Sequence, residues 1–247
     1  MALKLAGKVA LVTGGRQGLG RAMALGLAKA GADVMVADRV TDDGKLATVA
    51  KEIEALGRKA STSGGDISVE ADVLAMVNKA NTDLGKVDIL VNNAGVTAQD
   101  RFVDMPLRRW NLIINVNLNG TAFCTHAVLP QMIERNSGVV INISSILALQ
   151  VQYSVPYGAT KAAVERFTAG VAREIRKTNV SVTALRPFFV KTEVVSEFLD
   201  GRADMSDWEE PAMWGAYCAM VAGADPSVTT GKIFNQALLK ETFGNWK

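Results

Sequence analysis

Tyr157 and Lys161 stand four residues apart in the sequence YGATK, within a stretch rich in alanine. If this stretch is helical, the two side chains lie on one face of the helix, with Cβ atoms about 5–6 Å apart. A free phenol titrates near pH 10, so half-ionising it at neutral pH requires a pKa shift of about 3 units, or about 4 kcal/mol. A charged lysine one turn away supplies stabilisation of this kind, so the pair predicts a tyrosine that exchanges protons. About 0.2 such pairs are expected by chance in a chain of this composition, so the pair needs support from other motifs.

A glycine-rich loop near the N-terminus has the sequence TGGRQGLG, from Thr13 to Gly20, between an apolar run and a helical pattern. Glycines at 14, 18 and 20 let the backbone turn tightly and approach a pyrophosphate, which the following helix N-terminus would bind. The spacing differs from the usual dinucleotide fingerprint, and the loop lacks the Lys-Ser/Thr pair of nucleoside triphosphatases. A structural strand-to-helix turn is the alternative explanation of these glycines.

A carboxylate follows this loop at the distance expected for a ribose-binding residue. The run DVMVADR contains Asp38, about twenty residues beyond the loop, where it can accept hydrogen bonds from an adenosine ribose. Asp38 would repel the 2′-phosphate of NADP, which favours NAD. Arg16 and Arg39 instead favour NADP, because an arginine at this place can pair with that phosphate. A turn or cap residue at a strand end is the alternative role for Asp38.

Short apolar runs rich in β-branched residues alternate with longer segments of helical period. The runs are VALVT, DVMVAD, KAST, VDILVNN, GVVINIS, VSVTALRP and GKIFN. The clearest helical segments cover residues 19–30, 107–134 and 156–177. This alternation predicts a parallel sheet covered on both faces, with right-handed crossovers. We therefore predict a single α/β domain over residues 1–247, with a doubly wound (Rossmann-type) parallel sheet of about seven strands.

Further motifs follow the glycine loop in a regular order. They are DI at Asp66–Ile67, NNAG ending at Gly95, VNL around Asn117, NISS ending at Ser145, and then YGATK. Together with TGGRQGLG, these motifs resemble those of the classical short-chain dehydrogenase/reductase (SDR) family over nearly the whole chain. The resemblance implies hydride transfer between a substrate carbon and the nicotinamide ring of NAD or NADP.

The resemblance also implies roles for individual residues. Tyr157 would be the general acid/base, and Lys161 would lower the pKa of that tyrosine and bind the nicotinamide ribose. Ser145 would hold the substrate oxygen, and Asn117 would anchor a water that relays protons to Lys161. The implied cofactor-binding residues are Gly14, Arg16, Gln17, Gly18, Leu19, Gly20, Asp38, Arg39, Asp66, Ile67, Asn93, Ala94, Gly95, Tyr157, Lys161, Pro187, Val190 and Thr192.

Two serines compete for the substrate-binding role. Counting forward from Asn117 and from Gly138 selects Ser145, whereas counting back from Tyr157 by the commonest family interval selects Ser144. A one-residue deletion in ILALQVQYSVP reconciles the two counts and favours Ser145.

The segment RPFFVKTE departs from the family pattern, because Phe188 stands where glycine is usual. Phenylalanine does not readily adopt a positive φ, so the loop either runs differently or does not need that freedom. Whether Val190 and Thr192 have the cofactor-binding roles of their family counterparts depends on which of these two explanations holds.

Residues 193–214 mix acids with large apolar side chains and predict a cover over the cofactor and substrate. These side chains are Phe198, Leu199, Met205, Trp208, Met213 and Trp214. Four more apolar side chains extend the expected substrate pocket: Leu147, Tyr153, Phe188 and Phe189. An amphipathic segment packed on the core explains the same pattern equally well.

Overall composition bears on partners and location. The 247 residues carry a formal charge of +2 without a concentrated basic stripe, so we expect no nucleic acid and no membrane partner. Cys124 and Cys218 match no metal spacing, and His126 lies mid-helix without ligating neighbours, so we expect no metal and a reducing, cytoplasmic location. We expect a homo-oligomer: a dimer through residues 107–134 and 156–177, or a tetramer, although the C-terminus lacks the glycine pair common in tetrameric relatives.

The sequence thus favours an NAD(H)-dependent oxidoreductase that interconverts a secondary alcohol and a ketone of apolar character. The closest alternative is an NADPH-dependent reductase of 3-oxoacyl thioesters. A rival of another class is a non-catalytic, nucleotide-binding regulatory protein. Neither the particular alcohol nor the physiological direction follows from the sequence, because specificity depends on loops.

Overall fold

The computed structural model describes residues 4–151, 154–193, 195 and 205–246, and a seven-stranded sheet forms its centre. The strands are β1 (Val9–Thr13), β2 (Asp33–Asp38), β3 (Ala60–Gly64), β4 (Ile89–Asn92), β5 (Gly138–Ile143), β6 (Val180–Leu185) and β7 (Ile233–Phe234). Their order is β3-β2-β1-β4-β5-β6-β7, and each neighbouring pair is parallel. The order reverses between β1 and β4, so the predicted doubly wound, seven-stranded sheet is confirmed.

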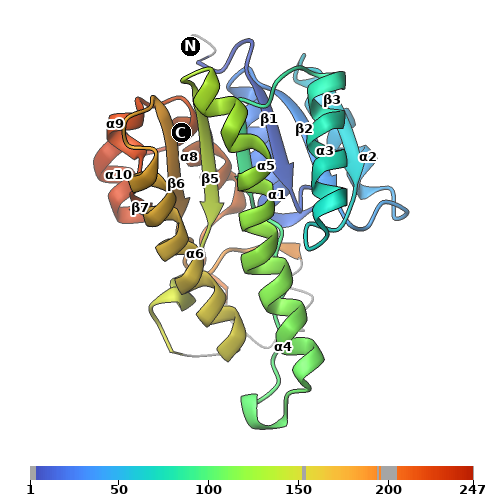
Figure 1. The fold of residues 1–247 in the computed structure, drawn as a ribbon, viewed down its shortest axis with the longest axis vertical. Helices are drawn as coiled ribbons and strands as arrows, with labels where there is room; N and C mark the ends of the chain where they lie inside the picture. The colour runs from blue at the N-terminus through green and yellow to red at the C-terminus, as the bar shows by residue number, and fades with distance from the viewer. Residues whose placement is uncertain (1–3, 152–153, 194, 196–204, 247) are drawn as a thin grey trace.

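Helices cover both faces of the sheet (Figure 1). The helices of the described residues are α1 (Gly18–Lys29), α2 (Lys45–Ala55), α3 (Glu70–Asp83), α4 (Leu107–Ile114), α5 (Thr121–Glu134), α6 (Val155–Glu174), α8 (Pro211–Ala222), α9 (Pro226–Thr229) and α10 (Gln236–Phe243). Of these, α4 extends beyond the ends of the strands (Figure 1). One buried cluster joins α1, α2, α8 and α10 to the sheet, and a second joins α3, α5 and α6. The two clusters lie on opposite faces of the sheet, as β1 shows: its alternate residues Ala10 and Val12 belong to the first cluster, and Leu11 between them belongs to the second.

The helices α1 and α8 lie in backbone contact at two glycines. A Cβ atom added to Gly26 would overlap the carbonyl of Gly215, and one added to Gly215 would overlap the carbonyl of Ala22. Larger residues would separate the two helices. This close packing fixes α8 against the helix that follows the glycine loop.

A continuous helical segment runs from Leu107 to Glu134 through α4, a π-helical turn (Asn115–Gly120) and α5. By length and composition alone it is able to span a membrane, with a mean hydropathy of 1.2 over its most apolar window. Its inner residues Cys124 and Val128 are 1% and 0% exposed and pack against the sheet. The α5 part of the segment is therefore a core helix of this fold, whereas α4 buries only Ile113.

Candidate active site

Helix α6 places Tyr157 and Lys161 side by side at the carboxyl end of the sheet. The Lys161 Nζ atom lies 5.4 Å from the centroid of the Tyr157 ring and donates a 2.7 Å hydrogen bond to the carbonyl of Ile143, at the end of β5. Lys161 is only 4% exposed. The amine therefore faces the tyrosine and the strand end rather than bulk water.

Burial shifts the pKa values of both groups. It raises the pKa of Tyr157, and a side-chain hydrogen bond with Ser145 opposes this rise. It lowers the pKa of Lys161 to about 8. Desolvation therefore dominates the pKa of Tyr157, and the expected lowering of that pKa by Lys161 stays a prediction.

The two candidate serines have different partners. Ser145 interacts with the Tyr157 side chain, and its Oγ accepts a 3.2 Å hydrogen bond from the amide of Leu147. Ser144 is 2% exposed, and its Oγ donates to Glu165 Oε1 at 2.6 Å instead of meeting the tyrosine. The geometry thus brings Ser145, and not Ser144, to the tyrosine.

Asn117 lies in the π-helical turn, which directs its side chain toward the loop after β4. Its Oδ1 accepts from the amide of Val96 at 2.8 Å, and its Nδ2 donates to the carbonyl of Val96 at 2.9 Å and to Thr160 Oγ1 at 3.1 Å. A Cβ atom added to Gly95 would lie 3.3 Å from Asn117 Oδ1 and 3.7 Å from Lys161 Nζ. Asn117 therefore ties the loop after β4 to the helix that carries the tyrosine, and its role toward a water stays a prediction.

The glycine loop has the close backbone packing that a cofactor cradle requires. Gly14 and Gly18 have φ values of 64° and 56°, and a Cβ atom on Gly20 would overlap the Gly14 carbonyl. The Asn93 Nδ2 atom donates to the carbonyls of Thr13 and Gly14, each at 3.0 Å. A Cβ atom on Gly14 would lie 2.8 Å from Ala94 Cα, so the NNAG motif packs directly on the loop.

The amino end of α1 already has an anionic neighbour. The amide of Gly18 donates to Glu193 Oε2 at 3.2 Å, and the side chain of the cap residue Gln17 makes no capping bond. Gln17 instead accepts a 2.8 Å hydrogen bond from Lys45 Nζ. A carboxylate therefore occupies a position that suits a phosphate group.

Arg16 bridges two carboxylates at the end of β2. Its Nε atom lies 3.3 Å from Asp38 Oδ1, and its Nη1 atom donates to Asp43 Oδ2. The Arg16 side chain is 18% exposed. Arg39 is exposed, and the described part of the chain gives it no ion pair. Arg16 is therefore neutralised locally, whereas Arg39 is not.

The remaining predicted cofactor residues divide into three groups. Thr192 and Val190 are each 8% exposed, and Thr192 packs against Gly18. Leu19 and Ile67 instead pack into the two halves of the core. Other members lie near the loops: Pro187, whose carbonyl accepts from Ile146 at 2.8 Å, and Asp66, whose Oδ1 accepts from Ser68 at 2.7 Å.

Phe188 does not require the freedom of a glycine. Among the described residues other than glycine, only Asn136 and Ser154 have positive φ values, so Phe188 does not. The amide of Phe188 donates to Glu209 Oε2 at 2.9 Å. Thr192 lies against Gly18, as the predicted role of Thr192 at the cofactor requires.

The segment predicted to cover the site is described in part. Phe189 stacks on Trp208 with ring centroids 4.9 Å apart, so Trp208 lies against the loop after β6. Met213 and Trp214 are 3% and 0% exposed and belong to the core, so the prediction that they cover the substrate is wrong. Tyr153, Phe198 and Leu199 lie outside the described residues.

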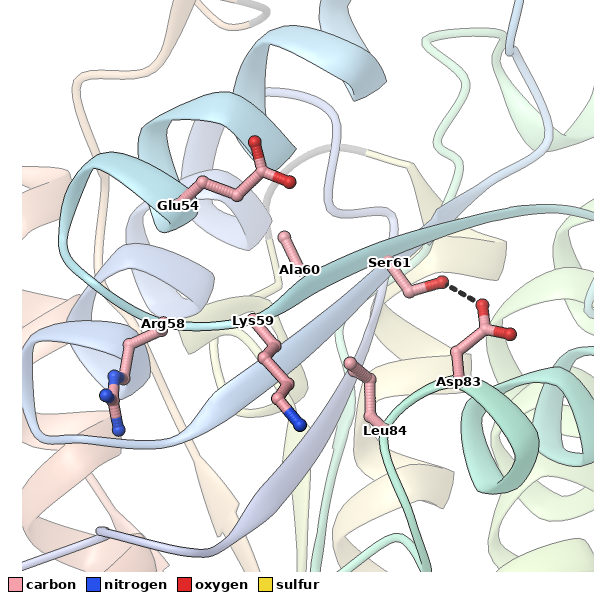
Figure 2. A pocket seen from close by; sticks show the side chains of 7 residues that line it. All are labelled: Glu54, Arg58, Lys59, Ala60, Ser61, Asp83 and Leu84. Carbon is pink, nitrogen blue, oxygen red and sulfur yellow. Dashed lines mark hydrogen bonds between the residues drawn. The ribbon is translucent and has the colours of Figure 1, made fainter.

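A pocket of about 550 Å³ lies elsewhere, at the amino end of the edge strand β3 (Figure 2). It is lined by Glu54, Arg58, Lys59, Ala60, Ser61, Asp83 and Leu84. Its Ser61 hydroxyl donates to Asp83, and none of the predicted site residues lines it. Ligands of doubly wound sheets bind at the carboxyl ends of the strands, so this pocket is not the candidate site.

The described residues contain no cluster of three or more side chains suited to hold a metal ion. Both cysteines are buried, and burial raises the pKa of each thiol to about 12. Neither thiol is activated for chemistry. Sequence reasoning missed four acidic residues near the site: Asp43, Glu165, Glu193 and Glu209. The spacing offered a signal only for Glu165, which lies four residues beyond Lys161.

Comparisons with known proteins identify the family of this chain. A family model described as short chain dehydrogenase matches residues 8–203. Dehydrogenase/reductase SDR family member 1 of Mus musculus is 33% identical, over 99% of this chain and 84% of that protein. The 5-keto-D-gluconate 5-reductase of Escherichia coli K12 is 34% identical, over 81% of this chain and 78% of that protein. A crystal structure of a short-chain type dehydrogenase/reductase from Mycobacterium marinum matches with a TM-score of 0.85 and 29% identity over 95% of each chain.

Proposed function

The chain belongs to the short-chain dehydrogenase/reductase family of oxidoreductases, and on this premise we propose that it transfers hydride between NAD(H) and a secondary alcohol or ketone. The observation that carries the proposal is the contact of Tyr157 with Ser145 beside the buried Lys161 amine. These three groups together can bind and protonate a carbonyl oxygen.

Members of this family generally bind NAD or NADP, and the residues of the glycine loop fit such a cofactor. Gly14, Gly18 and Gly20 would hold the pyrophosphate at the amino end of α1, and Asp38 would bind the adenosine ribose. Thr192, packed against Gly18, would contact the carboxamide end. When bound, the nicotinamide ring supplies or accepts the hydride.

The chain's own residues handle the proton. In reduction, Ser145 orients the carbonyl oxygen, and the Tyr157 hydroxyl donates its proton to that oxygen. In oxidation, the same proton returns from the alcohol to a Tyr157 phenolate. Because burial raises the pKa of Tyr157, the phenol is the main form at neutral pH, which suits reduction. Alkaline conditions favour oxidation.

The neighbourhood of Asp38 supports NAD over NADP. Asp38 and Asp43 both contact Arg16, so this guanidinium is not free to pair with a 2′-phosphate. The uncompensated charge of Arg39 is the observation that favours the alternative, an NADPH-dependent reductase of 3-oxoacyl thioesters. Titrating the protein with NADH and with NADPH discriminates between them.

An apolar substrate is supported by the side chains around the loop after β6. Phe188 is 45% exposed and packs edge-on against Phe189, which in turn stacks on Trp208. The exposed apolar side chains of Leu107 and Leu112 on α4 support association into a homo-oligomer, and we place the enzyme in the cytoplasm.

Replacing Tyr157 with phenylalanine tests the proposal. The Y157F variant should lose turnover by about 10²–10⁴-fold, because it removes the proton donor, and should bind NADH within about twofold of the wild type. Y217F is the matched control, since the Tyr217 hydroxyl is buried and bonds to the Gly244 carbonyl far from the site. Wild-type turnover in Y157F rejects the mechanism. Failure of the wild type to oxidise or reduce any member of an alcohol and ketone panel favours a non-catalytic, nucleotide-binding role.

A further inference from the structure

Residues 142–145, at the end of strand β5, are all bonded to helix α6: Asn142 Nδ2 donates to Thr168 Oγ1 at 2.9 Å, and the other three bonds involve residues 143–145. Of residues 143–145, the first accepts a hydrogen bond from Lys161 Nζ at 2.7 Å, the second donates to Glu165 Oε1 at 2.6 Å, and the third interacts with Tyr157. The helical partners of these three residues are spaced four residues apart, so they form one stripe along the helix. Two of these bonds involve Lys161 and Tyr157, the groups that would handle the proton. Glu165, which makes the third bond, takes no part in the proton transfer.

Glu165 is itself held by an arginine from the neighbouring strand. Arg186 follows β6 and donates from Nε to Glu165 Oε1 at 2.7 Å and from Nη2 to Oε2 at 2.6 Å. The two side chains are only 16% and 13% exposed. The backbone amide of Arg186 donates to the carbonyl of Phe234 at 2.7 Å, which fixes the arginine to β7. The carboxylate is therefore anchored to the sheet and cannot follow small movements of the helix.

Apart from Glu165, the Ser144 hydroxyl has only a weak hydrogen-bond partner. Its only other bond among the described residues is a long one, 3.4 Å, to the carbonyl of Lys161. Without Glu165, the link between the Ser144 hydroxyl and the helix would be reduced to this long bond. Asn142 and Asn117 would still hold α6 through Thr168 and Thr160, so the expected change is a small shift of the helix relative to residues 143–145.

We propose that Glu165 is a positioning residue that, clamped by Arg186, sets the register of α6 on the end of β5 through Ser144, so that Tyr157 meets Ser145. This inference rests on the proposed function, in which that meeting orients and protonates the substrate oxygen. A displacement of about 1 Å at a reacting group can cost about a hundredfold in rate.

Three variants test this role. S144A removes one hydroxyl and leaves the Glu165–Arg186 pair intact, whereas E165A removes the whole link. E165Q keeps an oxygen acceptor for Ser144. We expect S144A and E165A to lower kcat about tenfold to a hundredfold, with the Kd for NADH within about twofold, and E165Q to retain kcat within about threefold. E174A is the control, because Glu174 is an exposed glutamate on the same helix.

The second readout is the titration of Tyr157 itself. The chain has three tyrosines, so protein labelled with 13C at tyrosine Cζ should give signals that Y157F assigns. Loss of the Ser145 hydrogen bond should raise the pKa of Tyr157 in S144A and E165A by at least about half a unit, because that bond favours the phenolate. E165Q and E174A should titrate as the wild type does.

Folding defects are separated from the proposed role by the double variant E165L/R186M. E165A leaves a buried arginine unpaired, whereas the double variant replaces the pair by apolar side chains and leaves Ser144 without its acceptor. A folded S144A or double variant with wild-type kcat and wild-type Tyr157 titration overturns the proposal. A wild type without turnover, whose Tyr157 titration still moves in S144A, rejects the proposed function and supports the positioning role.

Discussion

The buried amine of Lys161 should make the stability of the cofactor-free protein depend on pH. Burial lowers the pKa of this lysine to about 8 in the folded chain, against an ordinary value of 10.5. Between these two values the unfolded chain binds more protons than the folded chain, so the free energy of unfolding rises with pH. A difference of about 2.5 pKa units corresponds to about 3 kcal/mol. Below pH 8 the lysine is protonated in both states, and the cost of burying its charge is present in full.

Lys161→Met isolates this contribution, because methionine has a similar length and no charge. Urea unfolding of the wild type and K161M from pH 7 to pH 10.5 gives the difference between their free energies of unfolding. We expect this difference to move in favour of the wild type by about 3 kcal/mol between pH 8 and pH 10.5. The tyrosines and cysteines that also titrate here are common to both proteins, so they cancel.

At pH 7 the two proteins should have similar stability. K161M avoids the burial of a charge but leaves the Ile143 carbonyl without its 2.7 Å partner, which costs about 1–3 kcal/mol. The pH-dependent change is therefore more informative than the difference at any one pH. A difference that stays constant from pH 8 to pH 10.5 would refute the reasoning, because it would mean that the amine is solvated as in the unfolded chain.

Two further predictions concern the cofactor loop. Asp43→Asn should leave Arg16 paired only with Asp38, so that its Nη1 atom can pair with a 2′-phosphate. We expect the Kd for NADPH relative to NADH to improve by about tenfold, with D42N, at the exposed neighbour Asp42, as the control. An unchanged ratio in fluorescence titrations contradicts the role given to Asp43. Glu193→Gln should tighten NADH binding about two- to fivefold, because it removes a negative charge from the amino end of α1, where the pyrophosphate would bind. E241Q, at an exposed site on α10, is the control, and equal Kd values for E193Q and wild type contradict competition at Gly18.

The fold could be predicted because its signals are local. Runs such as GVVINIS are apolar on both faces, as expected for a strand buried between two helical layers, and the structure places this run as β5 in the interior of the sheet, next to β4. The sequence signal for Tyr157 and Lys161 was equally local, because two helical side chains that are four residues apart lie on the same face. Which of the two serines meets Tyr157 depended on one residue of loop length, and only the structure decides it.

Contacts between elements could not be predicted in the same way. Trp214 and Met213 stand in a segment whose composition suits a cover, yet the close packing at Gly215 draws both into the core. The sequence suggested that Arg16 is free to bind a phosphate, because its partner Asp43 lies 27 positions away and belongs to no motif. The raised pKa of Tyr157 has the same origin, since sequence spacing shows that a lysine is near but does not show how far water is excluded.

The start of α6 indicates that the site, and not helix propensity, determines where this helix begins. Ser154, at the cap position, has a φ of 48°, and its buried Oγ has no hydrogen-bond partner within the described part of the chain. A serine in this backbone region is strained, and an unpaired buried hydroxyl adds a further cost. Neither would persist at a helix end that was free to move by one residue. The bonds from residues 143–145 to the stripe of α6 hold the helix in one register, and that register brings Tyr157 to Ser145 at the expense of a favourable cap.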